Sequence, residues 1–259
     1  MSTPEAVRPR ELALVFVMLA PLAVLFVAVP PITQDLSFHA LADRRAFLGV
    51  PNFFNVVSSL GFLLVAFLGM RLCLGQGVGG AARSWMVFFF GMLLIAFGSA
   101  YYHWTPNNAT LVWDRLPMTV AFMSLFAALI SEHVRPEIER TLLRVAIAVG
   151  IISVGWWHYT GDLRLYAWVQ LAPFLALVYV LIAFPARYTH RGYLLWGLVF
   201  YSLAKVVEFA DTAIYSATGH IISGHTLKHL LAAVAPYCVY LMLRKRRAVE
   251  DAGSRRTPG

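Results

Sequence analysis

The chain has 259 residues, of which 59% are hydrophobic and only 13% are charged. Soluble domains carry about 25% charged residues, so this composition excludes an ordinary water-soluble globular protein. The net charge of +8 does not indicate nucleic-acid binding, because most Lys and Arg lie in short loops and near the two ends, where membrane topology places them. Only helices and closed barrels satisfy their backbones in lipid, and the long apolar runs predict an all-α, polytopic membrane bundle.

Residues 1–31 contain a polar start with Arg8 and Arg10, followed by an apolar run over residues 12–29 that Pro30 and Pro31 close. A secretory signal peptide is the alternative interpretation of this run. No convincing small-residue cleavage site follows it, so we favour an uncleaved first membrane helix.

Seven further apolar runs follow in residues 32–243, which we predict to form one helical core. Each is near the roughly 20 residues that a helix needs to cross hydrocarbon. They cover residues 52–74, 85–103, 111–130, 142–158, 165–184, 193–215 and 226–243. Pro51 and Asn52 predict the start of the first of these helices, since Pro suits a first turn and Asn caps it. The basic tail, residues 244–259, has no periodic pattern and is predicted to be disordered.

Eight spans would place both termini on one side of the membrane. The Lys and Arg of the loops and tails all fall on that side, except Arg44, Arg45, Arg115 and Arg164. The positive-inside rule then predicts that both termini are cytoplasmic.

Candidate metal ligands lie at the helix ends on the opposite, extracytoplasmic side. His225 and His229 begin the last run, and residues four apart share one helix face with Cβ atoms roughly 5–6 Å apart. Two ring nitrogens at about 2.0–2.1 Å from one Zn²⁺ suit that spacing. His103 ends the run over residues 85–103, and Asp114 begins the next one. Taken alone, the H-x-x-x-H pattern is more often two unrelated polar residues.

Three imidazoles with an open fourth position are typical of a catalytic zinc site, where the metal lowers the pKa of a water molecule to about 7. Asp114 would accept a proton from that water and pass it to the leaving group. Ser99 shares a helix face with His103 and would hydrogen-bond to the water or to a developing oxyanion. The alternatives are an interfacial His103, a surface ion pair of Asp114 with Arg115, and a Ser99 bonded to its own helix.

A second polar cluster lies in the run over residues 193–215. Spacings of three place Lys205, Glu208 and Asp211 along one side of a helix. We favour a structural ion pair facing the bundle, with a proton relay or a head-group contact as the alternative. Lys228 is predicted to face away from the paired histidines and toward one of these carboxylates.

The pattern S-x-x-x-H at residues 99–103, Asp114, and H-x-x-x-H at residues 225–229 resembles the alkaline ceramidase family. That family belongs to a wider superfamily of membrane hydrolases that includes the progestin and adiponectin receptors. Residues 52–58, N-F-F-N-V-V-S, share the resemblance. It covers the second to eighth runs, which would form the seven-helix core of the family, and it makes the first run an addition.

The resemblance implies that His103, His225 and His229 hold zinc, and that Asp114 and Ser99 contact the attacking water. It also implies a zinc-dependent amide hydrolase that draws a ceramide-like N-acyl lipid from the bilayer. The products would be a fatty acid and a sphingoid-type amine, and the acyl chain would lie in an apolar cavity among the helices.

Animal ceramidases also bind calcium through an acidic N-terminal loop. Here Asn52 stands where a glutamate is expected, and Asp35 and Asp43 do not reproduce the acidic run, which puts calcium binding in doubt. The alternative function is a lipid-sensing receptor of the same superfamily with a structural zinc. An intramembrane Ser–His protease built on Ser99 and His103 would leave the other histidines unexplained.

Overall fold

The computed structural model describes residues 8–75 and 77–249. The helices, in chain order, are α1 (Pro9–Ala28), η1 (Leu36–His39), α2 (Phe53–Ser58), α3 (Leu60–Gly75), α4 (Ala82–Trp104), α5 (Asn108–His133), η2 (Pro136–Ile138), α6 (Glu139–Thr160), α7 (Arg164–Ala183), α8 (Gly192–Phe209), α9 (Asp211–Ala217) and α10 (Gly224–Lys245). No strand occurs in these two ranges, which confirms the all-α prediction.

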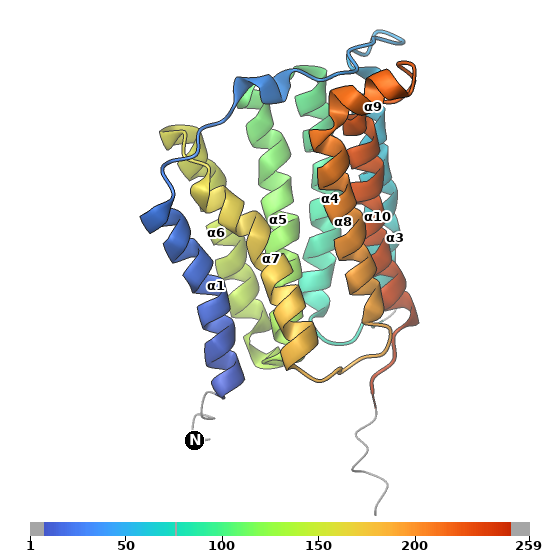
Figure 1. The fold of residues 1–259 in the computed structure, drawn as a ribbon. Helices are drawn as coiled ribbons and strands as arrows, with labels where there is room; N and C mark the ends of the chain where they lie inside the picture. Colours follow the sequence, from blue (N-terminus) through green and yellow to red (C-terminus); the bar gives the residue numbers. More distant parts are fainter. Residues whose placement is uncertain (1–7, 76, 250–259) are drawn as a thin grey trace, which may run out of the picture.

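The long helices stand side by side as one bundle (Figure 1). Helix α5 packs against α4, α6 and α7, while α10 packs against α8 and α3, and α1 rests on α7. Among the candidate membrane spans, α5 has the largest buried share. Because α5 lies in the interior, polar residues on it are held away from lipid.

Seven helical segments of the described chain are long and apolar enough to cross a membrane, with α2 and α3 counted as one segment. This confirms a polytopic membrane bundle. The predicted fifth span forms the 22-residue helix α6, whose first turns carry Glu139, Arg140 and Arg144. That helix is not among the seven, so a total of eight crossings stays a prediction.

The outer surface of the bundle is apolar, as expected of helices that face lipid. Phe67 and Phe97 expose 70% and 65% of their surface, whereas Trp85 and Phe89 are fully buried. Large exposed apolar surfaces are unusual on soluble monomers, so the exposed phenylalanines indicate contact with hydrocarbon.

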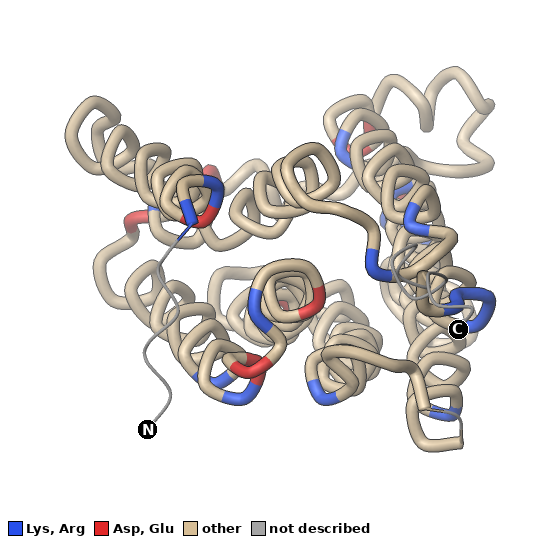
Figure 2. Tube along the Cα trace, turned by 90° about the horizontal axis from the view of Figure 1, so that it is seen from below, with Lys and Arg blue, Asp and Glu red and all other residues tan. Residues whose placement is uncertain are grey.

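Helix α1 begins and α10 ends at the same end of the bundle, the lower end in Figure 1. Figure 2 looks at this end from below and shows Lys and Arg at the helix ends and in the loops. The opposite end holds η1 and α9. This arrangement agrees with an even number of crossings, and the side of the membrane that each end faces stays a prediction.

Two of the predicted spans are interrupted. The run over residues 193–215 was expected to be one helix, but it breaks at Ala210, and Asp211 begins α9. The Asp211 carboxylate accepts hydrogen bonds from the backbone N–H groups of Ala42 and His225, so this turn connects separate segments. The run over residues 52–74 likewise divides at Ser59 into α2 and α3.

The predicted cap at Asn52 and the predicted disordered tail both need correction. Asn52 precedes α2, but its side chain makes no cap and donates instead to the carbonyl oxygen of His103 at 2.8 Å. The tail prediction is wrong for residues 244–249. Helix α10 continues to Lys245, and the Arg246 side chain is buried against Glu132 because these two groups form an ion pair. Residues 250–259 lie outside the described part of the chain.

Candidate metal centre

Three histidines from two helices meet at one point inside the bundle. His103 lies in the last turn of α4, and His225 and His229 lie in the first two turns of α10. All three are buried, and their ligand atoms lie within 4.8 Å of one another. The Nε2 atom of His103 is 3.2 Å from the Nε2 atoms of both other rings. A tetrahedral zinc bonded to nitrogens at about 2.0–2.1 Å separates them by about 3.3 Å, so the geometry fits a shared ion.

Hydrogen bonds outside the cluster orient the His229 ring. Its Nδ1 atom lies 2.8 Å from the Ser58 hydroxyl, which itself donates to the carbonyl oxygen of Asn55 at 3.0 Å. Because the single Ser58 proton is used by Asn55, Ser58 accepts the Nδ1 proton of His229. The Nε2 lone pair of His229 is then free on the side of the other two rings, as in metal-binding histidines.

The first turn of α10 is fixed by polar contacts that the sequence did not reveal. Ser223 caps the helix by accepting from the Thr226 N–H at 3.1 Å, and the Thr226 hydroxyl donates to Asn55 Oδ1 at 3.0 Å. The Asn55 amide in turn donates to the carbonyl oxygen of Asp43. Asn55 is fully buried, and it therefore ties α2 and the preceding loop to the helix that carries His225.

Ser99 and Asp114 are brought together beside the histidines. Ser99 lies one turn before His103 and accepts from the Ser59 hydroxyl at 3.2 Å. Ser99 and Asp114 both line the same cavity as His229. The structure therefore brings all five residues of the predicted site together.

The predicted alternative of a surface ion pair between Asp114 and Arg115 does not describe the structure. Both side chains are buried. The Arg115 guanidinium donates to the side-chain oxygen of Gln34 and stacks 4.0 Å from the ring centroid of Trp157.

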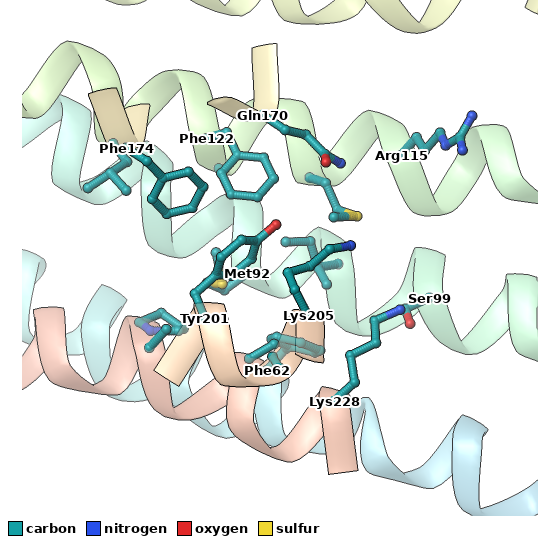
Figure 3. A pocket seen from close by; sticks show the side chains of 18 of the residues that line it. Phe62, Met92, Ser99, Arg115, Phe122, Gln170, Phe174, Tyr201, Lys205 and Lys228 are labelled. Carbon is teal, nitrogen blue, oxygen red and sulfur yellow. The ribbon is translucent and has the colours of Figure 1, made fainter. Parts of the chain in front are cut away.

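A cavity of about 340 Å³ leads away from the histidines between α5, α7, α8 and α10. Figure 3 shows Phe122 and Phe174 at one end of it and Ser99, Arg115 and Lys228 toward the other. Most of its lining is apolar. The volume falls within the 300–1,000 Å³ typical of small-molecule sites, and the shape suits a ligand with one polar end and one apolar end.

The second polar cluster contributes to this cavity. Glu208 pairs with Lys205 at 2.5 Å and with Lys228 at 2.7 Å, which confirms the expected ion pair between Lys205 and Glu208. Asp211 does not join them, because its carboxylate holds backbone groups. Lys228 meets Glu208 as predicted, but it does not face away from the histidines, since its Nζ atom lies 3.4 Å from His225 Nε2.

The N-terminal loop does not fit a calcium ion. Both carboxylate oxygens of Asp43 are taken by the Arg45 guanidinium, at 2.9 and 2.7 Å. Burial raises the pKa of the Asp43 carboxyl, but the hydrogen bonds and charge of Arg45 outweigh this effect and hold the pKa below its usual value. Asp35 caps η1, and Asn52 binds a backbone carbonyl. Within the described ranges, the three histidines are the one group of three or more His, Cys, Asp or Glu arranged to share an ion.

Comparison with known proteins identifies a family for this sequence. The family model that matches is described as ceramidase and covers residues 48–257. No curated protein matched the sequence. The matched range starts just before α2 and contains all three histidines together with Ser99 and Asp114, whereas α1 precedes it. Because the match spans most of the chain and includes the whole metal centre, the protein belongs to the ceramidase family.

Proposed function

We propose that the protein is a zinc-dependent membrane amide hydrolase that cleaves a ceramide-like N-acyl lipid to a fatty acid and a sphingoid-type amine. Membership of the ceramidase family implies amide hydrolysis. The observation that carries the zinc assignment is the convergence of three buried imidazoles with Nε2 separations of 3.2 Å. Imidazoles are among the ligands that bind zinc in proteins, and hydrogen bonds to Ser58 orient one of these three rings, that of His229.

His103, His225 and His229 would hold the ion. When bound, zinc would polarise the amide carbonyl and make an attacking water molecule more acidic. The Asp114 carboxylate would take the proton of that water and return it to the nitrogen of the leaving amine. Because Ser59 donates to the Ser99 oxygen, the Ser99 proton can point toward Asp114 or toward the oxygen on which charge develops.

The cavity supports a substrate with a long acyl chain. Its Phe122 and Phe174 end lies away from Ser99, Arg115 and Lys228 (Figure 3), so an acyl chain there would leave its carbonyl beside the metal centre.

We also propose that both termini are cytoplasmic and that the metal centre lies near the extracytoplasmic side. Two features support this orientation. The histidines lie at the bundle end opposite to both termini, and Lys and Arg gather at the terminal end, as the positive-inside rule requires.

Zinc content and lipid amide hydrolysis should be measured in the purified wild type, in His229→Ala and in Asp114→Asn. His229→Ala should lose both zinc and activity. Asp114→Asn should keep zinc and lose about 10²–10⁴-fold in rate, the range typical of general acid–base catalysis. His158→Ala is a matched control, because this histidine is exposed at the end of α6.

Equal zinc in the wild type and His229→Ala would contradict the metal site. A wild type that binds zinc through these histidines but hydrolyses no N-acyl lipid would favour the lipid-sensing receptor.

A further inference from the structure

The cavity beside the metal centre carries more positive than negative side chains. Its charged lining consists of Arg115, Lys205 and Lys228 against Asp114 and Glu208. The surplus is one cation before any metal is added, and a bound zinc ion would increase it. The remaining lining is apolar or neutral, so nothing else in the cavity wall offsets this charge.

The carboxylate of Glu208 is already shared. One oxygen pairs with Lys228 and the other with Lys205, so two ammonium groups depend on one anion. Lys228 also approaches His225 Nε2 at 3.4 Å, and the Lys205 side chain is 43% exposed. Cationic groups therefore extend from the metal centre to the more accessible part of the cavity.

Arg115 has an unused donor. The side chain is only 7% exposed, and its Nη1 atom has no hydrogen-bond partner among the described residues. Its position is nevertheless fixed, because Nη2 donates to Gln34 and the guanidinium stacks on Trp157 and Tyr166. A buried guanidinium that is held in place through Nη2 and has an unpaired Nη1 can donate a hydrogen bond to an acceptor on a ligand.

An uncompensated cation within a membrane-embedded bundle is energetically unfavourable. A ligand that brings one negative charge removes that cost, whereas a neutral ligand does not. We propose that the polar end of this cavity is an anion subsite, formed by Arg115, Lys205 and Lys228, that takes an anionic oxygen group of a lipid. The proposal rests on the function proposed above for the identity of that lipid.

Two sources supply this chemistry. One is the carboxylate of the fatty acid that hydrolysis of the amide releases. This carboxylate would form beside Lys228. The other is a phosphate on the head group of the N-acyl substrate. In both cases the subsite makes the protein prefer a lipid that carries a negative charge close to the amide or acyl carbon.

Binding to the wild type in discs of zwitterionic lipid tests the proposal without any turnover. The first arm compares a fluorescent polyene fatty acid with the polyene alcohol of the same chain. The second arm compares displacement of that alcohol by a ceramide analogue with a non-hydrolysable bond in place of the amide and by the 1-phosphate of the same analogue. At least one charged lipid should bind about tenfold more tightly than its uncharged partner, a ratio that one partly desolvated ion pair supports.

Three variants show whether the side chains named above cause the preference. Lys205→Gln removes the surplus charge and should reduce the ratio to about one while the alcohol binds as before, which also shows that the cavity is intact. Lys205→Arg should keep the ratio. Arg71→Gln removes one exposed charge on α3 that does not line the cavity, and it should leave the ratio unchanged.

A preference for the carboxylate alone assigns the subsite to the product, and a preference for the phosphate alone assigns it to the substrate head group. Equal binding of charged and uncharged lipids in both arms, or a ratio that persists in Lys205→Gln, would overturn the proposal. Hydrolysis of a neutral N-acyl amide, measured separately, keeps this result distinct from a failure of the proposed function.

Discussion

Ser58 lies outside the proposed ligand set but orients one of its members, His229. Its hydroxyl accepts from Nδ1 of His229 and donates to the carbonyl oxygen of Asn55. This pair of bonds selects the tautomer in which Nε2 of His229 presents a lone pair to a metal. The orientation of the His229 ring on α10 therefore depends on a hydroxyl group of α2.

Ser58→Ala should weaken zinc binding by about 10–100-fold, the usual effect of losing a partner of a metal-bound histidine. Competition with a chromogenic zinc chelator measures this change. Ser124→Ala is the control, because Ser124 is also buried but bonds to the carbonyl of Val120 in its own helix. Identical zinc affinities for Ser58→Ala and the wild type would mean that the histidine does not need this partner.

Asp162, in the loop between α6 and α7, makes a contribution to stability that depends on pH. Hydrogen bonds from Arg164 hold the pKa of its carboxyl at about 2, and the Ile32 N–H adds to this effect. Because the pKa is lower in the folded protein than in the unfolded chain, the stabilisation is fully present above about pH 4 and is lost as the pH falls toward 2.

Asp162→Asn should lower the melting temperature at pH 7 by about 2–4 °C, equivalent to about 1 kcal/mol for a chain of this size. The difference between variant and wild type should shrink as the pH is lowered from 4 to 2. Thermal unfolding in detergent across this range measures it, and a difference that grows toward low pH would contradict the assignment.

At the scale of helices, one buried ion pair joins the end of α5 to the chain that follows α10. Arg246 pairs with Glu132, and both side chains are at most 3% exposed. The Trp85 indole of α4 donates to the same carboxylate at 2.9 Å. Three segments distant in sequence thus share one carboxylate at the end of the bundle opposite to the metal centre.

Arg246→Met should destabilise the protein by about 3–5 kcal/mol, because it leaves Glu132 buried without its charge partner. Denaturant unfolding in detergent measures the loss. Combining Arg246→Met with Glu132→Gln should recover part of it, since the buried charge is then gone. The exposed neighbour Arg247 provides the control Arg247→Met, which should change stability by less than about 0.5 kcal/mol. A similar loss of stability in Arg246→Met and in Arg247→Met would show that burial of the ion pair is unimportant.

The helices and the ligand set could be predicted from the sequence because each follows from a local rule. Apolar runs of about 20 residues become helices in lipid, and four-residue spacing puts His225 and His229 on one face. Contacts between distant segments follow no such rule. The break at Ala210 depends on Asp211 binding the backbone of Ala42, and Lys228 reaches His225 because its long side chain folds back along the helix.

At the scale of the whole molecule, the side chain of Arg45 joins the N-terminal loop to the segment that leads into α10. This is the loop in which a calcium site was considered. Arg45 holds Asp43 and also donates to the carbonyl oxygen of Ile221 at 2.8 Å, in the connection before α10. A guanidinium fixed in this position leaves neither oxygen of Asp43 free for a divalent cation.

Zinc and calcium should therefore affect stability differently. Zinc at about 100 times its dissociation constant should stabilise the folded protein by about 2.7 kcal/mol, and calcium should leave the melting temperature unchanged. Scanning calorimetry of metal-free protein with each ion measures both effects. Arg45→Gln should lower the melting temperature in either ion, because it breaks the link between Asp43 and Ile221. Stabilisation of the wild type by calcium would contradict the assignment of the Asp43 carboxylate to Arg45.

The separation of 122 residues between His103 and His225 also has a consequence during biosynthesis. A ribosome delivers His103 to the membrane long before the last long helix, α10, emerges. Until that helix inserts, the nascent protein holds a single imidazole of the eventual cluster and cannot retain zinc by chelation. If the protein has the function proposed above, metal loading would follow insertion of α10, and a partly synthesised chain would not hydrolyse the lipids around it.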